Sequence, residues 1–151
     1  MYGDHGRSST HRQIPSLTRN LDGIRVGLRE FARSLVKSGL MTPDEVRAFY
    51  RSFPSNARPT SGMALAREMV KRGTLTTYQA SRLASGKYRG LVLGNLVLLE
   101  KIGKGGMGEV FRAQHRRMKR DVAVKILPEW AVESQVAVNR FQQEVEAAAR
   151  L

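Results

Sequence analysis

The apolar and polar positions of this chain follow two patterns, and the change lies near residue 91. Residues 21–90 show helical spacing, most clearly in the set Leu28, Phe31, Ala32, Leu35 and Val36. Gly39 comes next and predicts the end of a first helix, because glycine readily adopts the left-handed conformation of a C-cap. From Leu91 the apolar residues come in short runs that predict strands. The chain therefore divides into a helical part and a strand-rich part, which is an α+β arrangement.

A second helix is predicted to begin at Thr42. Thr42 can cap the helix, Pro43 suits its first position, and Glu45 can reach back to complete a capping box. The apolar face of this helix consists of Val46, Phe49 and Tyr50. Residues 54–59 begin and end with proline and predict a loop.

The stretch at residues 36–42, Val-Lys-Ser-Gly-Leu-Met-Thr, is echoed 34 residues later by Val-Lys-Arg-Gly-Thr-Leu-Thr at 70–76. Both copies predict a helix end, a glycine turn and a threonine-capped helix, and Gln79 completes a capping box in the second. Tetratricopeptide repeats share this period, but their Trp, Tyr and Pro positions are absent here. We predict a small four-helix module from Asp22 to about Ser85. The alternative that the copies share only turn chemistry stays open.

Three segments follow from these patterns. Residues 1–20 are polar and aperiodic, which predicts a disordered tail. Residues 21–90 form the helical module with a short linker at 85–90. Residues 91–151 form the strand-rich part, which ends in a helix.

Composition narrows the function classes. The chain has no cysteine, which excludes disulfides and thiolate metal sites. There is no secretory signal, and the longest apolar run, 91–99, is too short to span a bilayer, so we expect a cytoplasmic protein with no membrane segment in this chain. The net charge is +13, of which +10 lies in residues 1–90. The arginines are scattered and aromatic residues are few, so we favour solvated helix faces over nucleic-acid binding.

The candidate chemistry begins where a predicted strand, 96–102, runs into the glycine-rich segment Gly103-Lys104-Gly105-Gly106-Met107-Gly108. A Gly-x-Gly-x-x-Gly pattern occurs between a strand and a helix in dinucleotide-binding folds, and at a hairpin tip in protein kinases. Val110 and Phe111, with polar neighbours on both sides, indicate a second strand after the glycines. No Gly-Lys-Ser/Thr follows, which excludes a Walker loop. The pattern thus favours the hairpin.

A lysine at the end of a predicted strand follows the glycine-rich segment. Residues 122–125, Val-Ala-Val-Lys, predict a stiff strand that ends in Lys125, 17 residues after Gly108, and such a strand can hold a cation near phosphates. The plainer alternative is an ordinary strand-end lysine. Residues 141–151 predict a helix in which Glu144 or Glu146 could pair with Lys125. The two differ by about 200° around a helix, so one alone can face the lysine, and Glu144 borders the apolar face.

Together, residues 103–111, 122–125 and 140–151 resemble the bacterial members of the eukaryotic-type (Hanks-type) serine/threonine protein kinases, over about residues 95–151. The resemblance implies a partial kinase N-lobe of three antiparallel strands plus helix αC, and transferase activity from ATP to protein Ser/Thr in the complete protein. It implies that Lys125 and Glu144 form the catalytic ion pair and that Val110 and Ala123 pack on adenine. The implied nucleotide-binding set is Ile102, Gly103, Lys104, Gly105, Gly106, Met107, Gly108, Val110, Ala123 and Lys125.

Other groups of that family are absent. There is no His-Arg-Asp loop and no Asp-Phe-Gly, and all four aspartates precede Lys125. We therefore expect no metal ligands in this chain, magnesium only in the complete kinase, and no phosphoryl transfer by this chain alone, as for a fragment of a longer kinase. The expected partners are ATP and, in the complete kinase, a protein substrate. The alternative is a helical interaction or regulatory module, with its own protein partner, beside a vestigial N-lobe.

Overall fold

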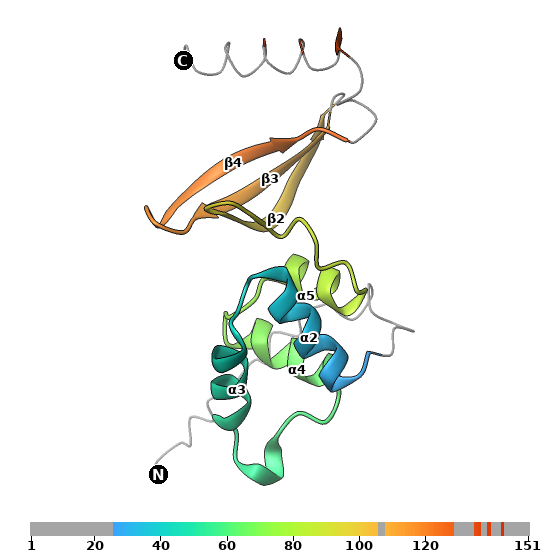
Figure 1. Cartoon of the computed structure of the whole chain (residues 1–151), viewed down its shortest axis with the longest axis vertical. Helices are drawn as coiled ribbons and strands as arrows, with labels where there is room; N and C mark the ends of the chain where they lie inside the picture. The colour runs from blue at the N-terminus through green and yellow to red at the C-terminus, as the bar shows by residue number, and fades with distance from the viewer. Residues whose placement is uncertain (1–25, 106–107, 129–134, 137–138, 140–142, 144–151) are drawn as a thin grey trace, which may run out of the picture.

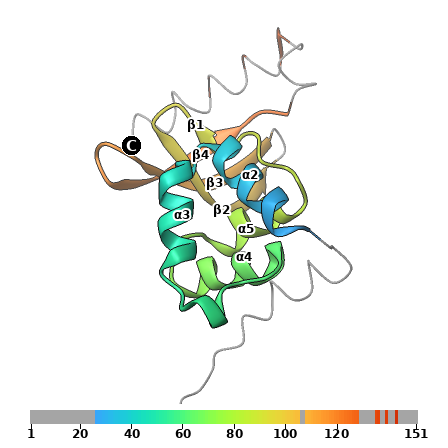
Figure 2. The same cartoon turned by 60° about the horizontal axis from the view of Figure 1, so that its bottom comes forward.

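A computed structural model describes residues 26–105, 108–128, 135–136, 139 and 143. The described part contains four α-helices, gathered at one end of the molecule, and a four-stranded sheet at the other (Figure 1). Figure 2 views the same arrangement from the helical end, with the sheet behind the helices. The α+β prediction is confirmed. Across these described ranges, no helix has the length and apolar character needed to cross a membrane.

The first helix ends and the second begins where their caps predict. Helix α2 (Leu28–Ser38) ends at Gly39, which has φ of 81° in the left-handed region. Helix α3 (Pro43–Arg51) starts after Thr42, whose side chain accepts a hydrogen bond from the Glu45 backbone N–H at 3.2 Å. The reciprocal bond expected from the Glu45 side chain does not form among the described hydrogen bonds of α3, so that cap is half of a capping box.

The second pair of helices repeats this geometry. Helix α4 (Gly62–Lys71) is followed by Gly73 with φ of 74°, and helix α5 (Thr77–Ala84) starts after Thr76. Here both halves of the capping box form: Thr76 accepts from the Gln79 N–H at 3.1 Å, and the Gln79 side chain accepts from the Thr76 N–H at 2.9 Å. The predicted helix–glycine–threonine pattern is confirmed in both copies. The predicted loop between the pairs includes a short 3₁₀ turn, η1 (Ser55–Ala57).

The four helices share one apolar core. Its buried residues are Val26, Phe31, Leu35, Val46, Leu65, Ala66, Met69, Leu75, Ala80, Leu83, Ala84 and Leu91. Gly62 lets α4 start against α2, because a Cβ there would lie 2.8 Å from the Gly27 carbonyl oxygen. Leu91, which follows the predicted linker, is 1% exposed and packs within this helical core.

The sheet is an antiparallel meander in the order β1-β2-β3-β4. Its strands are β1 (Val92–Leu93), β2 (Leu96–Gly105), β3 (Gly108–His115) and β4 (Arg120–Ile126). The expectation of three strands is wrong by one. Gly94, with φ of 58°, turns the apolar run 91–99 back on itself, so that β1 pairs with the start of β2.

One face of the sheet carries its small core. Leu98, Phe111 and Ala113 are buried there, with Leu96, Val124 and Ile126 packed against them. Tyr78 of α5 joins this cluster, its ring centroid 5.6 Å from that of Phe111. Burial raises the pKa of the Tyr78 hydroxyl. Val110 and Phe111 point to opposite faces of the sheet, because successive residues of a strand alternate in direction.

Helix α5 also holds the edge of β2. The Gln79 side-chain amide donates to the Leu98 carbonyl at 2.7 Å, and the Thr76 hydroxyl donates to the Leu99 carbonyl. These carbonyls lie at a bulge, where the pairing of β2 with β3 shifts between Leu98 and Glu100. The helical module thus satisfies backbone groups that β2 would otherwise leave open beyond its short pairing with β1.

Candidate functional site

The glycine-rich segment lies at the tip of the β2–β3 hairpin. Gly105 and Gly108 form the last residue pair of the antiparallel ladder, and Gly108 begins β3. The prediction that these glycines join two strands is confirmed, which excludes the strand-to-helix arrangement of a dinucleotide-binding fold. Gly106 and Met107 lie outside the described residues.

Two glycines of this hairpin differ in what the fold demands of them. Gly108 has φ of 145°, and a Cβ there would lie 2.3 Å from the Ile126 carbonyl oxygen, so the fold itself requires glycine. At Gly103 the nearest contact of an added Cβ would be the Val110 Cβ at 3.9 Å, an ordinary distance. Packing among the described residues therefore does not require a glycine at 103, and its missing side chain leaves open space beside its ladder partner Val110.

The candidate residues of three strands share the face opposite to Phe111. Val110 pairs with Gly103 on one side and with Lys125 on the other, so these three lie in one row across the sheet. Ala123 lies two residues before Lys125 and so faces the same way. Val110 and Lys125 are half-buried and Ala123 is exposed. The structure thus brings a glycine, two small apolar side chains and a lysine onto one surface.

The remaining described candidates lie nearer the tip. Ile102 is 54% exposed, and Lys104 is exposed and pairs with Glu109. The Lys101 ammonium donates to the Glu109 carboxylate at 2.6 Å, and this bond lowers the pKa of Glu109. Lys101 is in register with Phe111, so it lies on the core side of the sheet rather than beside Lys125.

A charged group that the sequence reasoning missed borders Ala123. Arg112 pairs with Ala123 in the ladder and donates to Glu100 and to Asp121, each at 2.9 Å. Both bonds raise the pKa of Arg112, and the bond to Glu100 has the larger effect. Arg112 lies two residues after Val110, so strand alternation could have placed it on this face. Glu100 could not have been placed, because the bulge beside it changes the alternation of β2.

The expected ion pair cannot be placed in full. Glu144, its alternative Glu146 and the predicted helix at 141–151 lie outside the described residues, apart from residue 143. Within the described ranges, no group of three or more His, Cys, Asp or Glu side chains is arranged to hold a metal ion.

Sequence comparison connects this chain with known enzymes. A 63-residue stretch is 43% identical to a probable serine/threonine-protein kinase of Clostridium perfringens, covering 41% of this chain and 9% of that protein. A 50-residue stretch is 44% identical to the serine/threonine-protein kinase pkn3 of Myxococcus xanthus, covering 33% and 9%. The human receptor-interacting serine/threonine-protein kinase 3 is 57% identical over 37 residues, covering 24% and 7%.

The chain contains a segment related to serine/threonine protein kinases. Each matched stretch covers less than a tenth of the length of its relative. No family model matches the chain, and no solved structure matches it either.

Proposed function

We propose that the β2–β3–β4 sheet is the nucleotide cradle of a serine/threonine protein kinase. The single observation that carries this proposal is the row Gly103, Val110 and Lys125 on one face, with the glycine-rich tip beside it. The kinase similarity of part of the chain supports the same assignment. In the complete protein, the reaction is phosphoryl transfer from ATP to serine or threonine of a protein substrate.

The residues present fit ATP. Backbone N–H groups of the glycine-rich tip would face the phosphates, which can approach because Gly103 has no side chain. Val110 and Ala123 offer an apolar surface for the adenine ring, and Lys125 supplies a cation on a strand for the α- and β-phosphates. We propose Glu144 as the side chain that orients this lysine. When bound, ATP supplies the transferable γ-phosphoryl group.

The residues present do not fit magnesium. The family's metal ligands, an Asn and the Asp of Asp-Phe-Gly, have no counterpart in the sequence. We therefore propose that this chain binds nucleotide without transferring phosphate by itself. Radiolabelled ATP and a generic basic substrate test this point: the expected result is no turnover, and turnover that Lys125→Met abolishes would contradict it.

Nucleotide binding is tested with two lysines that lie on opposite faces of the same sheet, Lys125 and Lys101. A fluorescent ATP analogue is titrated into the chain, its Lys125→Ala variant and its Lys101→Ala variant. Lys125→Ala should weaken binding at least about tenfold, the scale of one lost charge-assisted contact. Lys101→Ala should change binding less than about twofold, because Lys101 lies in register with Phe111 on the other face. Equal losses from both variants would refute a face-specific cradle.

A further inference from the structure

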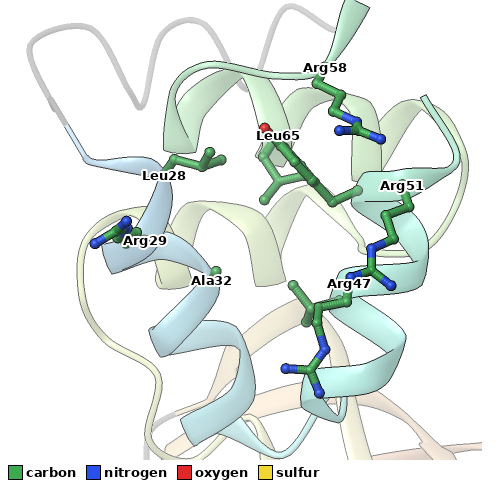
Figure 3. A pocket seen from close by; sticks show the side chains of 9 residues that line it. Leu28, Arg29, Ala32, Arg47, Arg51, Arg58 and Leu65 are labelled. Carbon is green, nitrogen blue, oxygen red and sulfur yellow. The ribbon is translucent and has the colours of Figure 1, made fainter. Parts of the chain in front are cut away.

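The helical module has a hollow of its own, far from the hairpin tip. It has a volume of about 400 Å³ and lies between α2, α3 and α4 (Figure 3). Apolar side chains form its floor: Leu28, Ala32, Val46, Tyr50 and Leu65. A hollow of this size falls in the range of ligand-binding pockets, roughly 300–1,000 Å³. Nothing in the proposed kinase chemistry uses it.

Four arginines form the rim of this hollow. In Figure 3, Arg47, Arg51 and Arg58 lie along one side of Leu65, and Arg29 lies on the opposite side. Arg29, Arg47 and Arg51 are exposed and Arg58 is half-buried. Lysine and arginine outnumber aspartate and glutamate by twelve to four over residues 26–90, so the rim lies in a basic surrounding.

Little negative charge within the described ranges offsets this rim. One salt bridge involves a rim residue there, Arg47 with Asp44, and both side chains are largely exposed at 60% and 90%. Such exposed pairs contribute little and exchange readily for another carboxylate. The Arg58 Nε is buried, and it has no hydrogen-bond partner among the described residues. Its guanidinium lies 5.5 Å from the centre of the Tyr50 ring, which holds it at the edge of the hollow.

We propose that this hollow, here called the arginine-rimmed groove, docks an acidic amphipathic peptide segment of a partner protein. Apolar side chains of the segment would enter the floor over Leu65, and flanking Asp or Glu side chains would pair with the four arginines. Apolar anchors in a groove with charged flanks are an established mode of peptide recognition. The complementary charges would set the orientation and speed the association.

Other occupants match the groove less well. A second copy of this chain carries a net charge of +13, and residues 1–25 carry four arginines against two aspartates, so both repel a basic rim. Single-stranded nucleic acid needs aromatic stacking platforms, whereas Tyr50 is the one aromatic side chain of the floor. A lipid surface favours protruding apolar side chains over a recessed floor.

The test uses a synthetic fluorescein-labelled peptide with leucines at i, i+3 and i+4 and glutamates on both flanks, titrated into the whole chain. Saturable binding that weakens with salt is expected. Arg51→Glu and Arg47→Glu should each weaken binding at least about tenfold, because each reverses a rim charge. The matched control is Arg33→Glu, an exposed position of α2 that does not line the groove. It should change affinity less than about twofold.

Two further arms separate the groove from non-specific attraction. A peptide with the leucines replaced by serine should lose binding, and Ala32→Leu, which fills the floor at unchanged charge, should weaken the original peptide. Circular dichroism of every variant confirms that the helices are intact. The proposal would be overturned if the serine peptide bound as tightly as the leucine peptide, or if Arg33→Glu weakened binding as much as the rim variants. It would also be overturned if anionic vesicles or DNA bound as tightly as the peptide and the rim variants weakened that binding.

Discussion

The helical module and the sheet differ in how each is stabilised. Twelve residues are buried in the cluster that the helices share, whereas the sheet buries three, Leu98, Phe111 and Ala113, in its own. Burial of apolar surface is the main stabilising term in folding, so the helical module has much the larger share. Helix α5 connects the sheet to the helical core. It contributes Tyr78 to the core of the sheet and side-chain donors to the edge of β2.

The proposed nucleotide face and its support lie on opposite sides of this sheet. Phe111 faces α5, and its neighbour Val110 faces the other way beside Lys125. A change in the helical module can therefore reach the proposed cradle through packing without touching it. Substitutions in either region can therefore show how far the two regions depend on each other.

The largest effect is expected from Phe31→Ala. Phe31 is 0% exposed at the centre of the helical core, and removing such a side chain costs about 3–5 kcal/mol. Urea unfolding should show that loss, together with loss of the sheet signal at the same urea concentration. The control is Leu93→Ala in β1, which is 41% exposed and should cost less than about 0.5 kcal/mol. A sheet that survives the unfolding of the helices would contradict the dependence.

Phe111→Ala tests the opposite direction. It removes the largest side chain of the small sheet core, and we expect a local loss of about 3 kcal/mol. Native-state hydrogen exchange should show faster exchange in β2, β3 and β4, while amides of α2 and α4 keep their protection. Equal loss of protection in all helices would instead indicate a single cooperative unit.

Signals that are local in sequence predicted most of the fold. Gly39 and Gly73 mark helix ends and Thr42 and Thr76 mark helix starts, because each cap depends on a few adjacent residues. Strand β1 escaped prediction since two residues carry no periodicity. The support of β2 by Gln79 also escaped, because a bond across 19 residues leaves no local pattern.

The candidate site was predictable in part for the same reason. A spacing of two places Ala123 and Lys125 on one face of any strand. Their alignment with Gly103 depends on the register between strands, which shifts at two irregularities of β2, near Leu98 and near Lys101. The pairing of Glu144 with Lys125 and nucleotide binding by Gly106 and Met107 stay predictions.

A smaller effect is expected from Gln79→Glu, which tests the junction itself. The glutamate keeps an oxygen for the Thr76 backbone N–H but replaces the donor to the Leu98 carbonyl by a second acceptor. We expect a loss of about 1–3 kcal/mol at neutral pH, partly restored when the glutamate is protonated. The matched control is Glu45→Gln at the same position of α3, with less than about 0.5 kcal/mol expected. An unchanged midpoint for Gln79→Glu would show that the junction bond is dispensable.

The smallest effect concerns acid. The pKa of Glu109 is lowered by its bond to Lys101, so the contribution of this pair is present above the ordinary carboxyl pKa. It is lost as the pH falls through the lowered value. In the Glu109→Gln variant, the thermal midpoint should therefore depend slightly less on pH below about pH 4. The difference from the parent chain should be small, because both groups of the pair are exposed. A steeper acid dependence in the variant would contradict the sign.

Nucleotide binding by the β2–β3–β4 face is tested most directly by mapping nucleotide contacts residue by residue. An isotope-labelled chain is titrated with a non-hydrolysable ATP analogue while its backbone amide resonances are followed by NMR. Saturable shifts are expected at Gly103, Gly108, Val110, Ala123 and Lys125, with smaller shifts in α2, α3 and α4. Saturable shifts confined to the helices, or none at the glycine-rich tip, would contradict it.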